Sequence, residues 1–224
     1  MSCPFGNMSK EFQILPGVLA YDEVDFKKRL LHTALNKVAG IFHVDVLDGS
    51  LFNAICWAEA SVVGTWKKVP NIELHCMVQN PLPVIESWCK YVPSLKRVIV
   101  HKEIGAPLQH VIDEVKLRRL EIIVAVNPDT PVDEVKHLEI DGLLVMGVAP
   151  GASGQPFLGE PILSKLRRAR VLFPNLLLAV DGGVNTHNLN EIKQAGASRC
   201  VVSSALWKSP NPEEEYENLL SKLS

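Results

Sequence analysis

The chain has 224 residues, of which 47% are hydrophobic and 21% are charged, and its formal net charge is −2. These proportions are typical of a globular protein with a full core. The basic residues are scattered, which gives no electrostatic support for a nucleic-acid partner. The apolar stretches, such as residues 120–126, are too short to span a bilayer, and no basic and then apolar leader opens the chain. We therefore expect a cytoplasmic protein with neither a membrane nor a nucleic-acid partner.

The cysteines point to the same compartment. There are five of them, an odd number, and no two share a CxxC spacing; they are Cys3, Cys56, Cys76, Cys89 and Cys200. This pattern argues against a disulfide framework or a structural zinc knot, and it suits a reducing cytoplasm.

Short β-branched runs alternate with amphipathic segments along the whole chain. The expected strands are residues 13–19, 41–46, 72–77, 97–101, 121–126, 142–146, 176–181 and 199–203. The expected helices are residues 22–37, 57–67, 81–91, 107–118, 131–138, 160–173, 187–195 and 212–223. Such alternation indicates parallel strands joined by crossover helices, and eight units in this length match a closed (β/α)8 TIM barrel better than an open doubly wound sheet.

No linker or shift in composition divides the chain, so we expect one barrel domain over residues 12–224. Residues 1–11 precede the first strand and are expected to form a tail. The sequence leaves the oligomeric state open, including a homo-oligomer.

Four side chains that can bind a metal fall at the ends of predicted strands. His43 and Asp45 end the second strand on one face of it, His75 lies late in the third, and Asp181 ends the seventh. Each alone is ordinarily a core histidine or a capping aspartate, but barrels carry their active sites at these strand ends, so the four together favour a site. Mixed imidazole and carboxylate ligands suit one divalent ion such as Zn²⁺, Fe²⁺, Mn²⁺ or Co²⁺. His101 ends the fourth strand and is a further candidate to line the pocket.

Glycine-rich segments follow the last three predicted strands. They are residues 148–155, Gly182-Gly183, and the Ser203-Ser204 turn. Barrels often bind phosphate at these late loops with backbone amides, although such loops also occur as plain turns.

The order and spacing of these motifs are similar to those of one family. From about residue 14 to residue 207 the chain resembles the ribulose-phosphate 3-epimerases, as a divergent member. The segments that carry the resemblance are residues 43–49, 74–77, 126–131, 145–155 and 180–184.

The resemblance implies an isomerase of the pentose phosphate pathway that acts on a sugar phosphate and inverts C3 of D-ribulose 5-phosphate to give D-xylulose 5-phosphate. It implies that His43, Asp45, His75 and Asp181 hold the metal and that Asp45 and Asp181 are the catalytic acid–base pair. A metal beside the ketone would stabilise the enediolate, and the two carboxylates would move the proton on opposite faces. The residues implied to bind substrate or phosphate are Met77, Met146, Gly151, Ser153, Gly154, Gln155, Gly182, Gly183, Ser203 and Ser204.

The chain also departs from the family pattern around this site. Gly17 stands where the family has a serine, Leu47 where it has a methionine, and Ser153 and Ser203 where it has glycines. Two alternatives therefore stay open: 3-epimerisation of another ketose phosphate, such as D-allulose 6-phosphate, or a non-catalytic barrel that binds a sugar phosphate.

Overall fold

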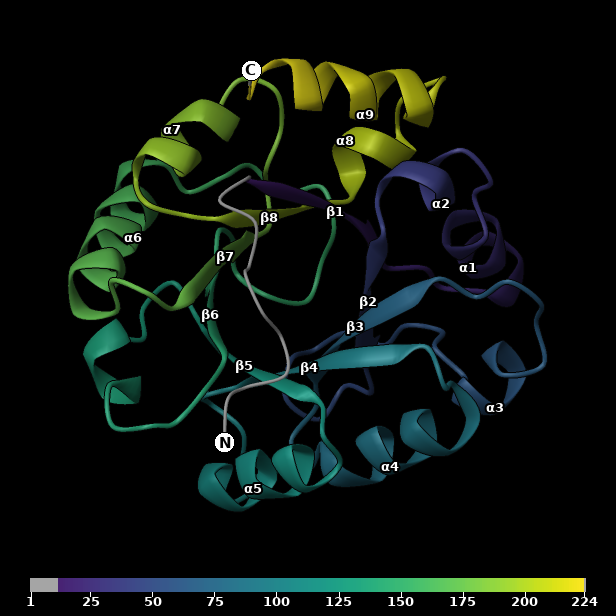
Figure 1. Ribbon diagram of the computed structural model, residues 1–224, viewed down its shortest axis with the longest axis horizontal. Helices are drawn as coiled ribbons and strands as arrows, with labels where there is room; N and C mark the ends of the chain where they lie inside the picture. Colours follow the sequence, from purple (N-terminus) through teal and green to yellow (C-terminus); the bar gives the residue numbers. More distant parts are fainter. Residues whose placement is uncertain (1–11, 224) are drawn as a thin grey trace.

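The computed structural model describes residues 12–223. Eight parallel strands pair in sequence order and close into a barrel, with β8 hydrogen-bonded to β1 (Figure 1). The strands are β1 (Gln13–Val18), β2 (Ile41–Leu47), β3 (Asn71–Met77), β4 (Leu95–His101), β5 (Glu121–Val126), β6 (Gly142–Met146), β7 (Leu177–Asp181) and β8 (Arg199–Val202). The predicted (β/α)8 barrel is confirmed, while the predicted tail of residues 1–11, with Cys3, lies outside the described residues.

The strands are buried on both faces, which is why they read as continuous apolar runs in the sequence. In β5 every residue from Ile122 to Val126 is buried. One face of each strand packs on the surrounding helices. Apolar side chains of the other face fill part of the barrel interior, and they are Ile99, Ile123, Ala125, Leu144, Met146, Leu177 and Ala179.

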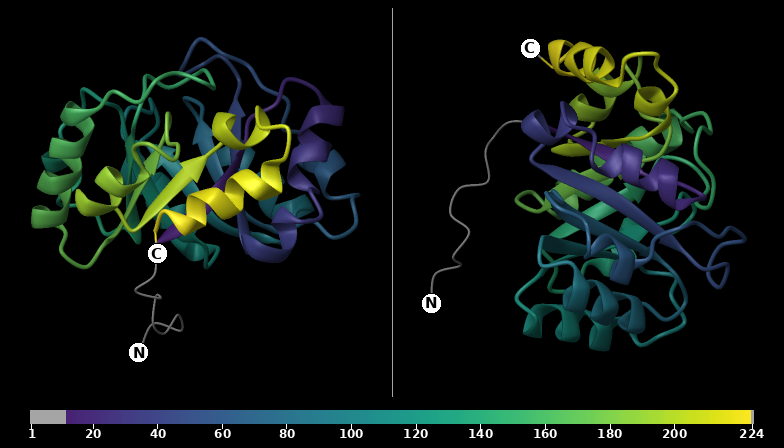
Figure 2. Two further views of the ribbon diagram at one scale, coloured as in Figure 1. Left: turned by 90° about the horizontal axis from the view of Figure 1, so that it is seen from above. Right: turned by 90° about the vertical axis from the view of Figure 1, so that its right-hand side faces the viewer.

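Helices form a ring outside the strands (Figure 1), and the two further views show helices on opposite sides of the barrel (Figure 2). They are α1 (Glu23–Leu30), α2 (Leu35–Val38), α3 (Ala60–Val63), α4 (Leu82–Tyr91), α5 (Leu108–Leu117), the 3-10 helix η1 (Val132–Val135), α6 (Glu160–Leu172), α7 (Leu189–Gln194), α8 (Ser204–Trp207) and α9 (Pro212–Ser221). Asp22 caps α1 by accepting a hydrogen bond from the Asp25 N–H at 2.9 Å. Within the described residues, no helix is both long enough and apolar enough to cross a membrane.

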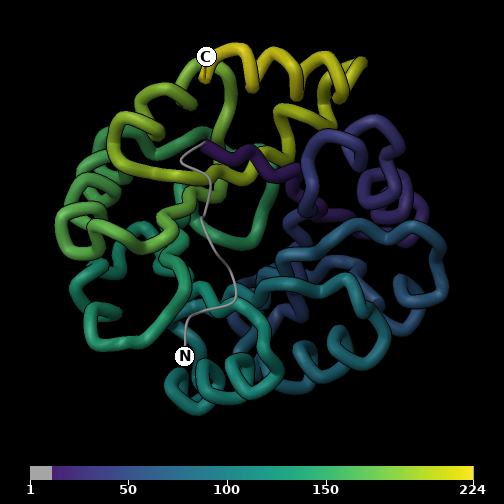
Figure 3. The backbone as a smooth tube through the Cα atoms, viewed as in Figure 1, coloured from purple at the N-terminus to yellow at the C-terminus, as the bar shows by residue number. Residues whose placement is uncertain are grey.

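Three of the predicted helices differ from the structure. The predicted helix at 22–37 is divided into α1 and α2, as the course of the backbone shows (Figure 3). At the break, the Asn36 side chain donates a hydrogen bond to the Leu30 carbonyl. The predicted helix at 57–67 shrinks to α3, because Trp57 and Trp66 stack on each other and lie against Phe26 instead of continuing the helix.

The third difference is at residues 131–138, where the structure has only the 3-10 helix η1. Its two buried residues, Val132 and Val135, are three positions apart and so lie one above the other on a 3-10 helix. A single tight turn therefore buries both of them against the barrel.

Candidate metal centre

Strand register brings the four candidate ligands to one end of the barrel. Asp45 on β2 is the register partner of His75 on β3, and His43 is the partner of Glu73, one step deeper. Asp181 ends β7. One donor atom from each of His43, Asp45, His75 and Asp181 lies within 4.8 Å of all the others.

The donor atoms face one another across short distances. Asp45 Oδ1 lies 3.2 Å from His43 Nε2 and 3.0 Å from His75 Nδ1. Asp181 Oδ2 lies 3.8 Å from the same nitrogen of His43 and 3.7 Å from that of His75. Two imidazole nitrogens and two carboxylate oxygens form a donor set that fits a divalent ion of borderline softness.

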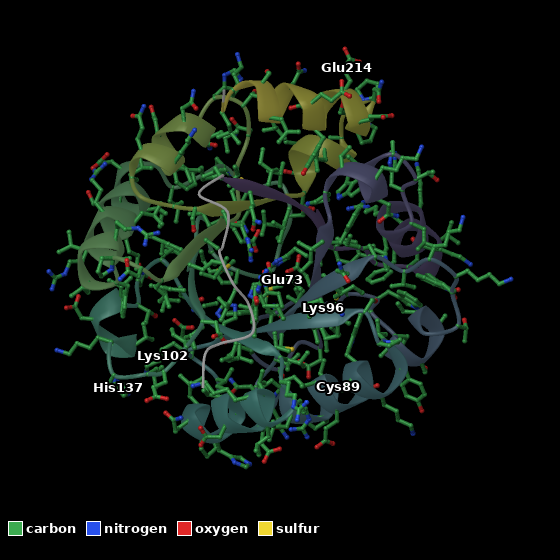
Figure 4. The ribbon with its side chains drawn as sticks, in the orientation of Figure 1. Glu73, Cys89, Lys96, Lys102, His137 and Glu214 are labelled. Atoms are coloured by element: carbon green, nitrogen blue, oxygen red, sulfur yellow. The ribbon has the colours of Figure 1, made fainter. Side chains whose placement is uncertain are left out.

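A buried glutamate orients His43 from below. His43 Nδ1 lies 2.8 Å from Glu73 Oε1, and the other oxygen of Glu73 accepts from Arg97 Nη1 at 2.8 Å and from Arg199 Nη1 at 2.9 Å. Glu73 lies inside the ring of strands (Figure 4). Burial alone would raise its pKa, but the hydrogen bond from His43 and the two guanidinium groups hold the pKa well below its usual range. His43 Nδ1 therefore carries a proton, which leaves Nε2 facing the other ligands.

The two aspartates have pKa values that are pushed in opposite directions. Burial, together with the negative charges of Asp45 and Glu73, raises the pKa of Asp181 to about 7, although the charge of His43 opposes this. For Asp45, burial is outweighed chiefly by the charge and the hydrogen bond of His43, which hold the pKa below its ordinary value. Two carboxyl groups whose pKa values differ in this way can act as an acid and a base in the same site.

Two of the candidate ligands, Asp45 and Asp181, line a pocket. His43 and His75 are completely buried behind them and contact Asp45. The same pocket is lined by all the residues that the sequence suggested for substrate or phosphate, namely Met77, Met146, Gly151, Ser153, Gly154, Gln155, Gly182, Gly183, Ser203 and Ser204. Their roles stay predictions, but the structure places them around one cavity.

The loop after β7 requires glycine at two adjacent positions on one side of the pocket. Gly182 and Gly183 have φ values of 105° and 71°, and a Cβ atom would lie 2.5 Å from Val148 Cγ2 at the first and 2.5 Å from Phe157 N at the second. Gln155 closes the neighbouring loop, because its Nε2 donates to the carbonyls of Ala149 and Ala152 at 2.6 and 3.0 Å.

Comparison with known proteins agrees with this geometry. The model of the ribulose-phosphate 3 epimerase family matches residues 13–207. The chain belongs to the ribulose-phosphate 3-epimerase family. The ribulose-phosphate 3-epimerase of Helicobacter pylori (strain J99) is 30% identical over 215 residues, which cover 92% of this chain and 96% of that protein. The enzyme of the same name from Bacillus subtilis is 30% identical over 178 residues, covering 75% of this chain and 80% of its own.

Solved structures of other enzymes share the fold alone. A tryptophan synthase α-subunit from Pyrococcus furiosus superposes with a TM-score of 0.71 at 17% identity, over 96% of this chain and all of that one. A 3-hexulose-6-phosphate synthase has a TM-score of 0.67 at 15% identity, over 96% of this chain and all of that one. The chain is thus an isomerase of the epimerase family, built on a barrel that other enzymes also use.

Two of the departures from the family pattern, Gly17 and Ser203, lie beside each other at the end of the barrel. A Cβ atom at Gly17 would lie 2.8 Å from Val201 Cγ1 and 3.1 Å from Ser203 Cβ, so a side chain at position 17 would clash with Val201 and crowd Ser203. The Ser203 hydroxyl is buried and has no hydrogen-bond partner among the described residues. Leu47 packs with Met77 and Leu19 at the pocket edge.

Sequence reasoning missed Glu73 and Lys208. Glu73 precedes His75 by two residues on a buried strand, so its inward direction was readable from the alternation of β3. Lys208 follows α8, and its Nζ lies 2.8 Å from where a Cβ of Gly154 would be. It lines a groove that continues from the pocket past Gly183 and Ser204. No pattern in the sequence connects Lys208 with that loop.

Proposed function

We propose that this protein is a metal-dependent epimerase that inverts C3 of a ketose phosphate, with D-ribulose 5-phosphate and D-xylulose 5-phosphate as its substrate pair. The observation that carries this proposal is the set of four donor atoms within 4.8 Å of one another, of which the two aspartates line a pocket with glycine loops in its wall. Membership of the epimerase family supports the same reaction.

Four residues would hold the ion, which is one of Zn²⁺, Fe²⁺, Mn²⁺ and Co²⁺. They are His43 through Nε2, His75 through Nδ1, Asp45 through Oδ1 and Asp181 through Oδ2. When bound, a divalent ion supplies positive charge beside the substrate's ketone and hydroxyl oxygens, which stabilises the enediolate as it forms.

Asp45 and Asp181 would move the proton. The lowered pKa of Asp45 keeps it ionised, and the pKa of about 7 lets Asp181 exist in either form near neutrality. Strands β2 and β7 are separated in the closed sheet by β1 and β8, so the two carboxylates enter the pocket from different directions. One carboxylate can accept the C3 proton while the other returns a proton to the opposite face, which inverts the carbon.

Apolar side chains would keep water away from the reacting carbon. Met77 and Met146 are almost completely buried and line the pocket beside the aspartates. Thioethers neither accept nor donate protons at neutral pH, so they shield an anionic intermediate without competing for its proton.

The loops after β6, β7 and β8, which line the pocket, would bind the phosphate group. The loops that contain Gly154 and Gly183 allow a close backbone approach, the free Ser203 hydroxyl can donate a hydrogen bond, and Lys208 provides a cation beside Gly154. A phosphate held there fixes the distance from the sugar's phosphorylated end to its reacting carbon.

Turnover measurements test the proposal and its alternatives together. The protein is stripped with a chelator, reloaded with each of the four ions, and assayed on D-ribulose 5-phosphate and D-allulose 6-phosphate. We expect metal-dependent conversion of ribulose 5-phosphate and little activity after stripping. Faster turnover of D-allulose 6-phosphate would identify that sugar phosphate as the substrate instead. Binding of both sugar phosphates without turnover under any ion would show a non-catalytic binding barrel and overturn the proposal.

A further inference from the structure

His101 continues the chain of buried side chains beyond the candidate ligands. It ends β4, has no exposed surface, and places its Nε2 2.9 Å from Nε2 of His75. The planes of the two rings are nearly parallel, inclined by 13°, and the ring centroids are 5.0 Å apart. This geometry is that of a direct hydrogen bond between two imidazoles.

Glu103 holds the far side of His101. Its Oε2 lies 3.3 Å from His101 Nδ1. Its Oε1 accepts hydrogen bonds from the Asn127 N–H at 3.0 Å and from the Thr130 hydroxyl, both in the segment after β5. These bonds, with that from His101, hold the pKa of Glu103 at about 2, against the effect of its burial, so Glu103 is an anion in the folded protein.

The chain of contacts permits one arrangement of protons if His75 is to bind a cation. An imidazole that offers a lone pair on one ring nitrogen carries its single N–H on the other. A free lone pair on His75 Nδ1 requires the proton on its Nε2, which then donates to His101. His101 must accept on Nε2 and carry its own proton on Nδ1, where the anionic Glu103 accepts it.

We propose that His101 and Glu103 are positioning residues that fix the tautomer of His75, so that its Nδ1 lone pair faces the metal site before the ion arrives. The tautomer of His43 is fixed by direct contact with the Glu73 carboxylate. His75 has no such direct partner and is linked to the Glu103 carboxylate through the ring of His101. This inference rests on the proposed metal site. Partners that orient ligating histidines in this way typically contribute 10- to 100-fold in metal affinity, as an order of magnitude.

The substitution Glu103→Gln would reverse the positions of the protons on His101 and His75. Its amide oxygen would stay with the two donors from Asn127 and Thr130, which turns the NH2 group toward His101 Nδ1. His101 would then have to accept on Nδ1 and carry its proton on Nε2, pointing at His75. The proton of His75 would move to Nδ1, the atom that the metal needs.

The experiment reads the tautomer of His75 in the metal-free protein by long-range ¹H–¹⁵N NMR and measures Zn²⁺ affinity by competition with a chelator. We expect an Nε2–H tautomer in the wild type and an Nδ1–H tautomer in Glu103→Gln, with a Zn²⁺ affinity roughly 10- to 100-fold lower. The matched control is Glu134→Gln, which changes an exposed glutamate paired with Lys102 nearby and leaves both readouts as in the wild type.

Two variants of His101 test the middle of the chain independently of Glu103. His101→Gln keeps an oxygen that can accept from His75, so it retains more Zn²⁺ affinity than His101→Leu, which keeps none. An unchanged His75 tautomer in Glu103→Gln, or equal affinities of the two His101 variants, would overturn the inference. If the tautomer and affinity shift as expected but the zinc-loaded wild type converts no ketose phosphate, the proposed function fails and the positioning role stands.

Discussion

Two charged clusters lie inside the barrel, one above the other, and their charges are balanced differently. In the lower cluster Glu73 is paired with the guanidinium groups of Arg97 and Arg199. In the upper cluster Asp45 and Asp181 converge on two imidazoles, and among residues 12–223 no lysine or arginine forms an ion pair with either aspartate.

The difference separates a structural cluster from a functional one. A buried carboxylate that has its own cations is satisfied and titrates far below neutrality, as Glu73 does. A carboxylate that is buried beside another one and has no lysine or arginine partner is left with a raised pKa, as Asp181 is. The upper cluster is therefore the one that gains from a bound dication and from proton transfer.

The largest effect is expected when the upper cluster loses Asp181. Asp181→Asn removes both a metal ligand and a proton carrier without changing the size of the side chain. We expect kcat on D-ribulose 5-phosphate to fall by roughly 10²- to 10⁴-fold, the contribution usual for a general acid or base. The control is Asp113→Asn on the exposed face of α5, and equal activities of the two variants would contradict the role of Asp181.

The lower cluster should respond in the stability of the fold, in addition to the effect that Glu73 has on metal binding through His43. Glu73→Gln leaves two buried guanidinium groups without their shared carboxylate, so we expect the free energy of unfolding to fall by about 3–5 kcal/mol, measured by urea denaturation. Glu160→Gln breaks an exposed pair with Arg167 and should change it by less than about 1 kcal/mol. Similar changes in both variants would show that the lower cluster is not structural.

A smaller effect is expected in the pH dependence of metal binding, which reports on the protons held by the upper cluster. The ion must displace the proton of Asp181, whose pKa is about 7, and that of His43, whose pKa is raised by Asp45 although burial opposes it. Affinity should therefore fall as pH drops below 7, by about tenfold or more per pH unit. Calorimetric titration in buffers with different ionisation enthalpies measures the released protons, and binding without proton release at pH 6.5 would contradict the raised pKa values.

Titration of Asp181 changes the stability of the metal-free protein in the opposite direction. Metal affinity falls as the pH drops, whereas this contribution to the free energy of unfolding grows. A pKa raised from 3.8 to about 7 means that the folded chain binds the proton more tightly than the unfolded chain. This contribution to stability is complete below about pH 4 and is lost as the pH rises through 7.

The smallest effect is expected at the edge of the upper pocket. Lys208→Met removes the cation beside Gly154 but retains the length of the side chain. Because Lys208 is exposed, its attraction for a phosphate is screened by solvent, and we expect KM to rise by about fivefold with little change in kcat. Lys193→Met, on the outer helix α7, is the control; a fall in kcat at constant KM would place Lys208 elsewhere in the reaction.

The barrel could be predicted from the sequence because its strands are buried on both faces and therefore read as apolar runs, and because a helical segment separates each run from the next. The boundaries of β5 and β6 were predicted correctly to the residue. The helix at 57–67 was predicted wrongly because stacking of Trp57 on Trp66 is a tertiary contact that helical periodicity does not record. Local patterns thus specify the strands of this chain better than its shorter helices.

For the site, residue types at strand ends were enough to predict which side chains converge. Period-2 alternation placed His43 and Asp45 on one face, and the same rule applied to Glu73 would have revealed the partner of His43. The contact between Gly17 and Ser203 was not readable, because the two residues are 186 positions apart and meet only when β8 pairs with β1. Lys208 depends in the same way on the closure of the barrel.

Solvent exchange at the reacting carbon tests the central claim, that Asp45 and Asp181 help to hold a metal ion and move the C3 proton. The metal-loaded protein is incubated with D-ribulose 5-phosphate in D₂O, and deuterium at C3 is followed by NMR. The account predicts deuterium at C3 that depends on the metal and is abolished in Asp181→Asn. No deuterium at C3 with any of the four ions, or equal exchange in Asp181→Asn, would contradict it.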